Sequence, residues 1–370
     1  MPKRVLNLKR RIGRKRESVV QKNHTPAALA AAFRRQAGYC AELGSPLWSE
    51  AMDKVAADIE AGGPFARFLA DWEGDLERGI LPLRLFGGLH FLALGGAAPA
   101  LAAELPSTGG SPDGELWPVL CRTLAGNEAL LRRFLEHPPQ TNEVGRSAIF
   151  LGGFLEIAAR SGLPLSLHEI GASAGLNLCW DRFAFHLGPH RWAGSDPGLT
   201  LTADWRGPPP QLDVQPVIAA RQACDRRPVD LADPEARLRL QGYVWPEQLD
   251  RLARLRAAIA LASEIGVRID AADAQDWTAR KLAARPAGQT MVIYHSIVLQ
   301  YFDAAARQDF AGMIETAGNA ATAERPLAWL SFEEASAGDQ FELALTVWPG
   351  GERRRLATAH AHGRWIEWVG

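Results

Sequence analysis

Apolar side chains recur at helical spacing through the first part of the chain. Between Thr25 and Ser161, Ala, Leu and Phe return every three or four positions, and Gly-Gly pairs or Pro interrupt the pattern. This spacing places the apolar side chains on one face of a helix, and the interruptions are typical of helix ends. We therefore predict a helical N-terminal domain over residues 25–161, preceded by a tail over residues 1–24.

After Ser161 the pattern changes to short apolar runs separated by helical segments and turns, which indicates an α/β domain over residues 162–370. Helices at about 247–265 and 303–316 lie between these runs, so parallel crossover connections are expected. The last two runs are joined by a Pro-Gly-Gly-Glu turn, which favours a hairpin. The predicted sheet has seven strands: Leu165–Ile170, Val217–Cys224, Val267–Ala272, Thr290–Tyr294, Leu327–Phe332, Phe341–Trp348 and Leu356–Ile366.

An insertion separates the first predicted strand from the second. Within it, Phe183–Leu187, His190–Ala193 and Leu199–Trp205 show strand-like alternation before three consecutive prolines end the pattern. We expect a small antiparallel sheet over residues 183–210.

Composition is that of an ordinary globular protein, with 47% hydrophobic and 22% charged residues. The most apolar stretch, residues 80–103, contains charged, Pro and Gly residues, and is expected to form a buried helix rather than a membrane span. The four cysteines are scattered without a C-x-x-C pair, which favours reduced thiols. No apolar stretch follows the N-terminal charges, so we expect no secretory signal and a cytoplasmic location.

Charge is unevenly distributed. The first sixteen residues hold eight Lys or Arg and no acid; removing this +8 from the net charge of −1 leaves about −9 on the remainder. We interpret the basic tail as a disordered extension without a role in the main function. The acidic body lacks a basic track with interleaved aromatic residues, so a duplex nucleic acid is not an expected partner. His360 and His362 form an H-x-H pair with no evident third ligand, and no metal site is predicted.

The segment LHEIGASAGLN, Leu167–Asn177, supports two incompatible interpretations. Gly171-Ala172-Ser173-Ala174-Gly175 matches the G-x-S-x-G elbow of serine hydrolases, in which Ser173 would be the nucleophile. If the motif is instead taken to start at Glu169, it matches a glycine-rich cofactor loop on a strand-to-helix turn. The hydrolase elbow normally follows several earlier strands, whereas this one follows the first. The sequence contains residues that could complete a catalytic triad with Ser173: Asp270 or Asp273 as the acid, and His295 or His360 as the histidine.

Acids at the ends of the next two predicted strands favour the cofactor loop. Asp225 ends strand two, where a carboxylate can accept both hydroxyls of a ribose; Asp204 is a competitor that suits the inserted sheet better. Asp273 follows strand three, where it could accept from an adenine amino group. Gly171 and Gly175 would let the backbone approach a nucleoside, with the following helix N-terminus favouring an anion. The G-x-G-x-x-G of nicotinamide enzymes is not satisfied.

Further polar residues are candidates for substrate contacts. His295, at the end of strand four, could act as a base or hydrogen-bond the substrate, and Tyr294 precedes it. The run Gln140-Thr141-Asn142-Glu143 is interpreted as the start of the helix that leads into strand one, with Arg146 one turn further on. We expect Gln140 and Asn142 to contact substrate and Arg146 to hold a carboxylate in a forked pair.

Several longer motifs resemble those of the bacterial domain-of-unknown-function family 2332 (DUF2332), whose sheet half is similar to class I S-adenosylmethionine (SAM)-dependent methyltransferases. They are PPQTNEVGRSA (138–148), EIGASAGLNL (169–178), DWRG (204–207), CDRRPVDL (224–231), WPEQ (245–248), YHS (294–296) and VWPGG (347–351). The resemblance implies a Rossmann-like, methyltransferase-type sheet. Ser173 replaces the middle glycine of the usual loop, and Tyr294-His295-Ser296 replaces the Asn/Asp-Pro-Pro-aromatic motif of amino-directed enzymes.

The resemblance implies SAM as cofactor, with a binding set of Glu169, Gly171, Ser173, Gly175, Asp225 and Asp273. The leading hypothesis is a methyltransferase that acts on a small molecule. Two alternatives stay open: a non-catalytic, methyltransferase-like nucleoside-binding protein, and a serine hydrolase that uses Ser173. The acceptor and the oligomeric state are left open.

Overall fold

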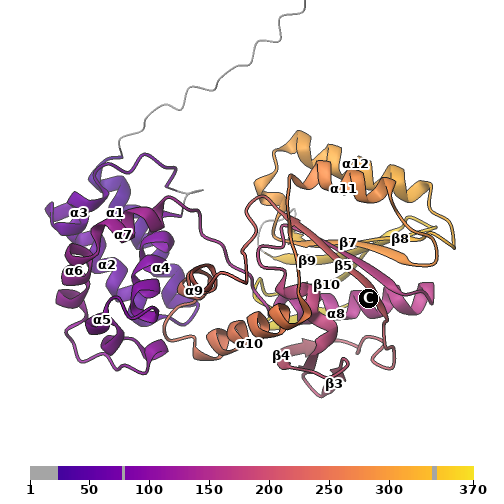
Figure 1. Ribbon diagram of the computed structural model, residues 1–370, viewed down its shortest axis with the longest axis horizontal. Coiled ribbons are helices and arrows are strands. Elements are labelled where there is room, and N and C mark those ends of the chain that lie inside the picture. The colour runs from indigo at the N-terminus through magenta and orange to yellow at the C-terminus, as the bar shows by residue number, and fades with distance from the viewer. Residues whose placement is uncertain (1–23, 77–79, 336–339) are drawn as a thin grey trace, which may run out of the picture.

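The computed structural model describes residues 24–76, 80–335 and 340–370, which form two lobes (Figure 1). Apart from His24, the predicted tail lies outside the described residues. The fold is mixed α/β with a mostly parallel sheet.

The first lobe consists of helices. Its elements are α1 (Pro26–Glu42), α2 (Pro46–Ala61), α3 (Pro64–Leu69), α4 (Leu81–Leu94), α5 (Pro99–Glu104), the 3-10 helix η1 (Pro106–Thr108), α6 (Leu116–Gly126) and α7 (Glu128–Leu135). Proline stands at the start of many of them, where its missing N–H costs nothing. Their apolar faces meet in one core, in which Trp48 lies edge-on to Phe86 with ring centroids 5.0 Å apart.

The second lobe is built on an eleven-stranded sheet of order β3-β2-β4-β11-β10-β9-β8-β7-β1-β5-β6. From β6 to β8 the strands are parallel; β8 to β11 are antiparallel; β11, β4 and β2 are parallel, and β3 is antiparallel to β2. The bounds are β1 (Leu165–Ile170), β2 (Phe183–Leu187), β3 (His190–Ala193), β4 (Leu199–Arg206), β5 (Ile218–Asp225), β6 (Asp270–Ala271), β7 (Thr290–Ser296), β8 (Leu327–Glu334), β9 (Phe341–Trp348), β10 (Arg353–Ala359) and β11 (Trp365–Trp368).

The predicted seven-stranded sheet is therefore wrong in size, for two reasons. The run Leu356–Ile366 is broken by a turn in which the N–H of Gly363 bonds to the carbonyl of His360, so it contributes to both β10 and β11. The insertion is not a separate antiparallel sheet, because β4 pairs with β11 and extends the main sheet, and β4 and β2 are parallel. The hairpin at the Pro-Gly-Gly-Glu turn is confirmed as β9 and β10.

Helices cover both faces of the parallel strands. Helices α8 (Arg146–Ser161) and α10 (Leu249–Ile265) lie on one face, and α11 (Ala274–Ala283) and α12 (Ala304–Asn319) on the other (Figure 1). Helix α9 (Pro234–Gly242) packs on α4 and links the lobes.

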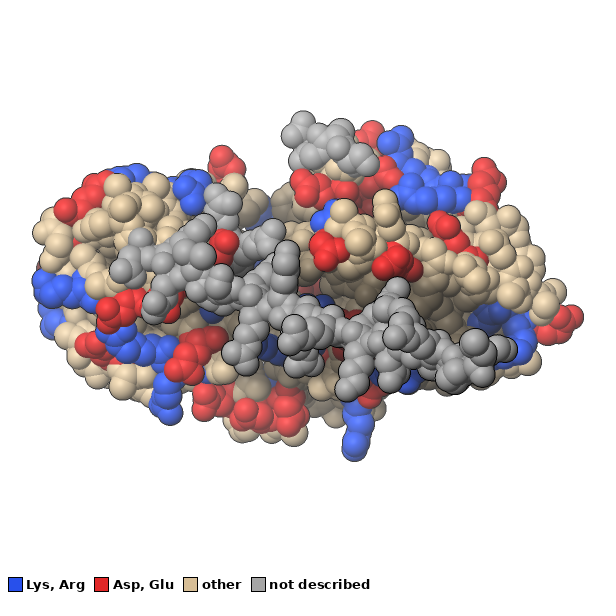
Figure 2. Space-filling model, turned by 90° about the horizontal axis from the view of Figure 1, so that it is seen from above, with Lys and Arg blue, Asp and Glu red and all other residues tan. Residues whose placement is uncertain are grey.

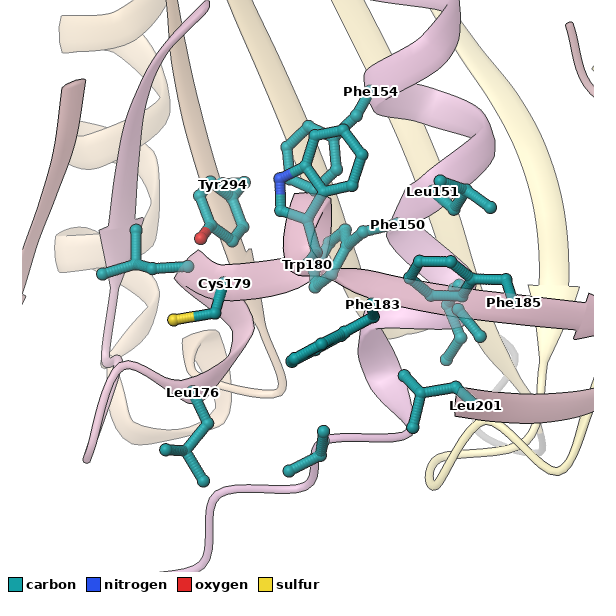
Figure 3. Close-up of a cluster of buried hydrophobic side chains, with 14 of the residues drawn as sticks. Phe150, Leu151, Phe154, Leu176, Cys179, Trp180, Phe183, Phe185, Leu201 and Tyr294 are labelled. Atoms are coloured by element: carbon teal, nitrogen blue, oxygen red, sulfur yellow. The ribbon is translucent and has the colours of Figure 1, made fainter. Parts of the chain in front are cut away.

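Aromatic rings fill the core between α8 and the sheet. Phe154 on α8 stacks on Trp180, with ring centroids 4.5 Å apart and planes 8° apart, and Tyr294 on β7 meets Phe154 edge-on (Figure 3). Helix α8 thus shares its core with the sheet, although it precedes the domain boundary expected at residue 161, which stays a prediction.

In the described ranges, no helix is both long and apolar enough to cross a membrane. The apolar stretch 80–103 contains α4, whose side chains are largely buried in the helical lobe. On the face seen in Figure 2, acidic and basic side chains are interspersed over both lobes.

Candidate functional site

Two loops meet where the strand order reverses direction. After β1 and the insertion β2–β4, the chain adds β5 and β6 on one side of β1 and then β7 and β8 on the other. Loop 171–175 follows β1, and loop 297–301 follows the adjacent strand β7. A Cβ atom at Gly171 would lie 2.5 Å from Cγ2 of Val298, so the loops touch at a glycine. We call the region where they meet the switch-point site.

The loop after β1 has an irregular, tightly bonded backbone. Gly171, Ser173 and Gly175 have φ angles of 67°, 54° and 70°, in the left-handed region. The N–H groups of Gly171 and Ala172 both donate to the carbonyl of Cys224, at 2.9 and 3.1 Å. This conformation suits glycine, whereas Ser173 adopts it at an energetic cost.

The expected strand-to-helix turn is not present. Loop 171–175 is followed by a 3-10 helix, η2 (Leu176–Arg182), and not by an α-helix. The side chain of Asn142 accepts the N–H of Leu176 at 2.9 Å, so a distant segment satisfies the backbone at this point. The anion-favouring dipole of a long helix is therefore missing here.

Asp225 holds the glycine loop from the end of β5. Its Oδ2 accepts the N–H of Ser173 at 2.9 Å, and its Oδ1 accepts the N–H of Arg227 at 2.8 Å. Each carboxylate oxygen has a second lone pair, which leaves capacity for another donor. Its competitor Asp204 lies on β4, far along the sheet, and pairs with Arg206 at 2.8 Å.

Asp273 stands after β6, next to Asp225 in the order of strand ends. It is the N-cap of α11, accepting the N–H of Gln275 at 2.9 Å, and it pairs with Arg226 at 2.9 Å. Burial alone would raise the pKa of Asp273, but the bond from Arg226 and the backbone N–H groups hold that pKa below its usual value.

Glu169 and Tyr294 lie in the core under α8. The hydroxyl of Tyr294 donates to Oε2 of Glu169 at 3.2 Å across neighbouring strands, and both side chains are buried. Burial raises the pKa of Glu169 to about 8, although hydrogen bonds from Tyr294 and Asn177 oppose the rise. Glu169 is thus a buried carboxyl that supports the strand before the loop.

His295 points to the opposite face of β7, toward α12. It is fully buried; its Nδ1 lies 2.7 Å from Oε1 of Glu333, and its Nε2 lies 3.0 Å from the indole nitrogen of Trp329. Glu333 also accepts the N–H groups of Val298 and Leu299. Both ring nitrogens are therefore engaged, and His295 braces the loop after β7. Sequence reasoning missed Glu333 and Trp329; an acid at the end of β8 was the available signal.

Ser173 has none of the partners of a serine nucleophile. Its Oγ is buried and has no hydrogen-bond partner among the residues that the structure describes. His295 is engaged elsewhere, and His360 accepts the N–H of His362 in the turn after β10. A serine nucleophile needs a base within hydrogen-bond reach.

The polar run 140–143 precedes α8 instead of beginning it, because that helix starts at Arg146. Together with Arg146, it contacts the ends of three strands or the loops that follow them. Gln140 donates to the carbonyl of Arg227 after β5; Asn142 reaches η2 after β1. Arg146 donates to Oγ of Ser296 at the end of β7, at 3.1 Å, and to the carbonyl of Ala361 at 3.0 Å. The structure thus brings Gln140, Asn142 and Arg146 to the edge that carries the two loops.

A buried ion pair in the same segment was not foreseen. Glu143 pairs with Arg251 of α10 at 2.7 Å. Burial alone would raise the pKa of Glu143, but the charge of Arg251 holds it below the usual value. Within the described residues, no three His, Cys, Asp or Glu side chains are grouped to hold a metal ion.

Comparison with known proteins gives one match. The profile of the family described as "Uncharacterized protein conserved in bacteria (DUF2332)" matches residues 30–368. No curated protein and no solved structure matches.

Proposed function

The chain belongs to the DUF2332 family, and we propose that it is a SAM-dependent methyltransferase that acts on a small molecule. The observation that carries this proposal is the position of loop 171–175 at the point where the strand order reverses. Open α/β sheets bind their ligands outside the carboxyl ends of the strands at this point.

The layer arrangement supports a Rossmann-like assignment of the parallel strands. Their order is β6-β5-β1-β7-β8, with α8 and α10 on one face and α11 and α12 on the other. This is a doubly wound arrangement whose first strand lies in the middle. The antiparallel strands and the insertion extend the sheet away from the switch-point site.

The residues of the loops fit a nucleoside cofactor. Gly171 and Gly175 give a backbone with little side-chain bulk, and the buried Oγ of Ser173, which has no partner among the described residues, offers a hydrogen-bonding group. The remaining lone pairs of Asp225 suit ribose hydroxyls, and Asp273 suits the adenine amino group. When bound, SAM supplies an electrophilic methyl group.

The hydrogen bonds of His295 limit the kinds of methyl acceptor that the proposed enzyme could use. Because both of its ring nitrogens are engaged within the core, we assign it a positioning role rather than that of a base. A reaction without a dedicated base relies on alignment and on the exclusion of water. It suits an acceptor that is already anionic at neutral pH, such as a carboxylate or an acidic thiol.

Calorimetric titration with SAM and S-adenosylhomocysteine tests the proposal. We expect both to bind the wild type, and Asp225→Ala to weaken binding roughly tenfold or more, since it removes a charged acceptor. Asp204→Ala is the matched control and should leave affinity unchanged. Absence of binding by both compounds at millimolar concentration would overturn the proposal.

Two further outcomes distinguish the alternatives. Binding without methyl transfer to any acid or thiol in a broad panel would favour a non-catalytic nucleoside-binding protein. Covalent labelling of Ser173 by a fluorophosphonate probe would favour a serine hydrolase. We expect no labelling, because the Ser173 Oγ has no base beside it in the described structure.

A further inference from the structure

A cleft lies on the sheet lobe, at its border with the helical lobe and outside the switch-point site. It has a volume of about 560 Å³, within the range of small-molecule pockets. Its walls come from residues 143–145, β4, the start of α10 and the turn between β10 and β11. Arg251, Arg254 and Arg364 line it, so two separate segments contribute cations.

Arg254 is the cation with the greatest free capacity. It is half-buried, and among the described residues no side chain or carbonyl accepts from it. Arg364 donates to the carbonyl of Leu43 through Nη2, which leaves its other N–H groups available. An arginine in a concave, partly desolvated wall without a partner is poised to bind an anion.

The acidic side chains of the cleft either already have hydrogen-bond partners or are exposed to solvent. Glu143 is held by Arg251 and by the N–H of Gly145 at 3.1 Å. Glu247 accepts the hydroxyl of Ser45 at 2.6 Å and the N–H of Leu47 at 2.7 Å. Asp250 lies in the exposed first turn of α10. None of these three acids forms an ion pair with Arg254.

His362 also lies in the wall of the cleft. Burial and the charge of the neighbouring Arg251 lower the pKa of His362 to about 3, against the opposing effect of Glu143. His362 is therefore neutral at physiological pH and adds a polar group without adding a charge.

We propose that this cleft binds the phosphate group of a small molecule through Arg254, with Arg364 as a second donor. A carboxylate is satisfied by one arginine in a forked pair, whereas a phosphate has three terminal oxygens to share between several donors. The ligand would lie next to the helical lobe, since the lining residues Glu247 and Arg364 each contact the segment 43–47 of that lobe. This inference does not depend on the methyltransferase proposal.

Titration of the full-length chain with inorganic phosphate and pyrophosphate, at constant ionic strength, tests this proposal. We expect binding to the wild type, and Arg254→Gln to weaken it roughly tenfold or more through loss of charge-assisted bonds. The control is Arg268→Gln, which removes the same charge from an exposed arginine with no partner in the described structure. It should leave affinity unchanged.

Three results would overturn the proposal: no binding of either anion in the millimolar range, an equal loss in both variants, or acetate binding as tightly as phosphate. Circular dichroism confirms that each variant folds. If Arg254→Gln does not fold, Arg364→Gln takes its place. An affinity for phosphate unchanged by Arg364→Gln would then refute the site.

Discussion

The indole N–H of Trp329 donates a hydrogen bond to Nε2 of His295, with the nitrogens 3.0 Å apart. Because an indole nitrogen can only donate, Nε2 of His295 must accept, and the proton of the neutral ring lies on Nδ1. Nδ1 faces Glu333 at 2.7 Å. The buried imidazole thus joins β7 to β8 and orients Glu333, which accepts the N–H groups of Val298 and Leu299 in the loop after β7.

Replacing His295 should therefore lower stability. His295→Ala leaves the partly buried Trp329 indole N–H unpaired, removes one of the partners of Glu333, and opens a cavity where the buried imidazole was. We expect the free energy of unfolding to fall by roughly 3 kcal/mol, measured by urea denaturation. His186→Ala, at an exposed position of β2, is the control and should change little. A loss for His295→Ala as small as that of the control would contradict this bracing role.

Ser173→Gly should be tolerated and even stabilising. Residue 173 has φ 54°, which costs an L-residue about 1–2 kcal/mol, while glycine in an unfolded chain costs about 0.5–1 kcal/mol. The change also removes a buried hydroxyl that has no hydrogen-bond partner within residues 24–76, 80–335 and 340–370. We expect a free energy of unfolding equal to or up to about 1 kcal/mol above that of the wild type.

The control for this prediction lies in the same loop. Ala174 is buried and does not have a positive φ, so Ala174→Gly gains nothing from the left-handed region and loses a packed methyl group. It should be destabilising by about 1 kcal/mol. If the two variants lost equal stability, the left-handed strain at Ser173 would be refuted.

Local patterns predicted most of the elements. The alternation and apolar runs gave β1 its observed bounds, Leu165–Ile170, and placed α10 within two residues of its start. The short β6 was overestimated, since the apolar Val267 and Ile269 pack against Gly175 before the strand begins. Pairing between β4 and β11 could not be foreseen, because it joins segments far apart in the chain and leaves no local signature.

The candidate site was predictable only in part. Motif spacing predicted residues 169–175, Asp225 and the run 140–146 as site residues. The fold places them at one edge of the sheet. The role of His295 was not predictable, because its partners Trp329 and Glu333 come from β8 and depend on strand register. An isolated histidine at a strand end looks the same in sequence whether it faces solvent or the core.

Glu169 should make stability depend on pH. Burial raises its pKa to about 8, so the folded chain holds a proton that the unfolded chain releases near pH 4.5. Its contribution to stability is therefore fully present below about pH 4.5 and is lost as pH rises through about 8. The limiting slope for one group is about 1.4 kcal/mol per pH unit.

Glu169→Gln should flatten this dependence, because the amide keeps an acceptor for Tyr294 and cannot ionise. Urea denaturation between pH 6.5 and 8.5 is the measurement, since buried His90 and His168, whose pKa values burial lowers to about 4, act only below about pH 6.5. An unchanged slope in the variant would show that another group titrates.

The buried pair Glu143–Arg251 yields a double-mutant prediction. Its atoms are 2.7 Å apart, and its side chains are 3% and 16% exposed. Removing one partner leaves an uncompensated buried charge, so Glu143→Gln and Arg251→Met should each lower the free energy of unfolding by about 3–5 kcal/mol. The double variant should recover much of that loss, because no isolated charge remains. Losses that simply add, read from urea denaturation of all four chains, would show that Glu143 and Arg251 act independently.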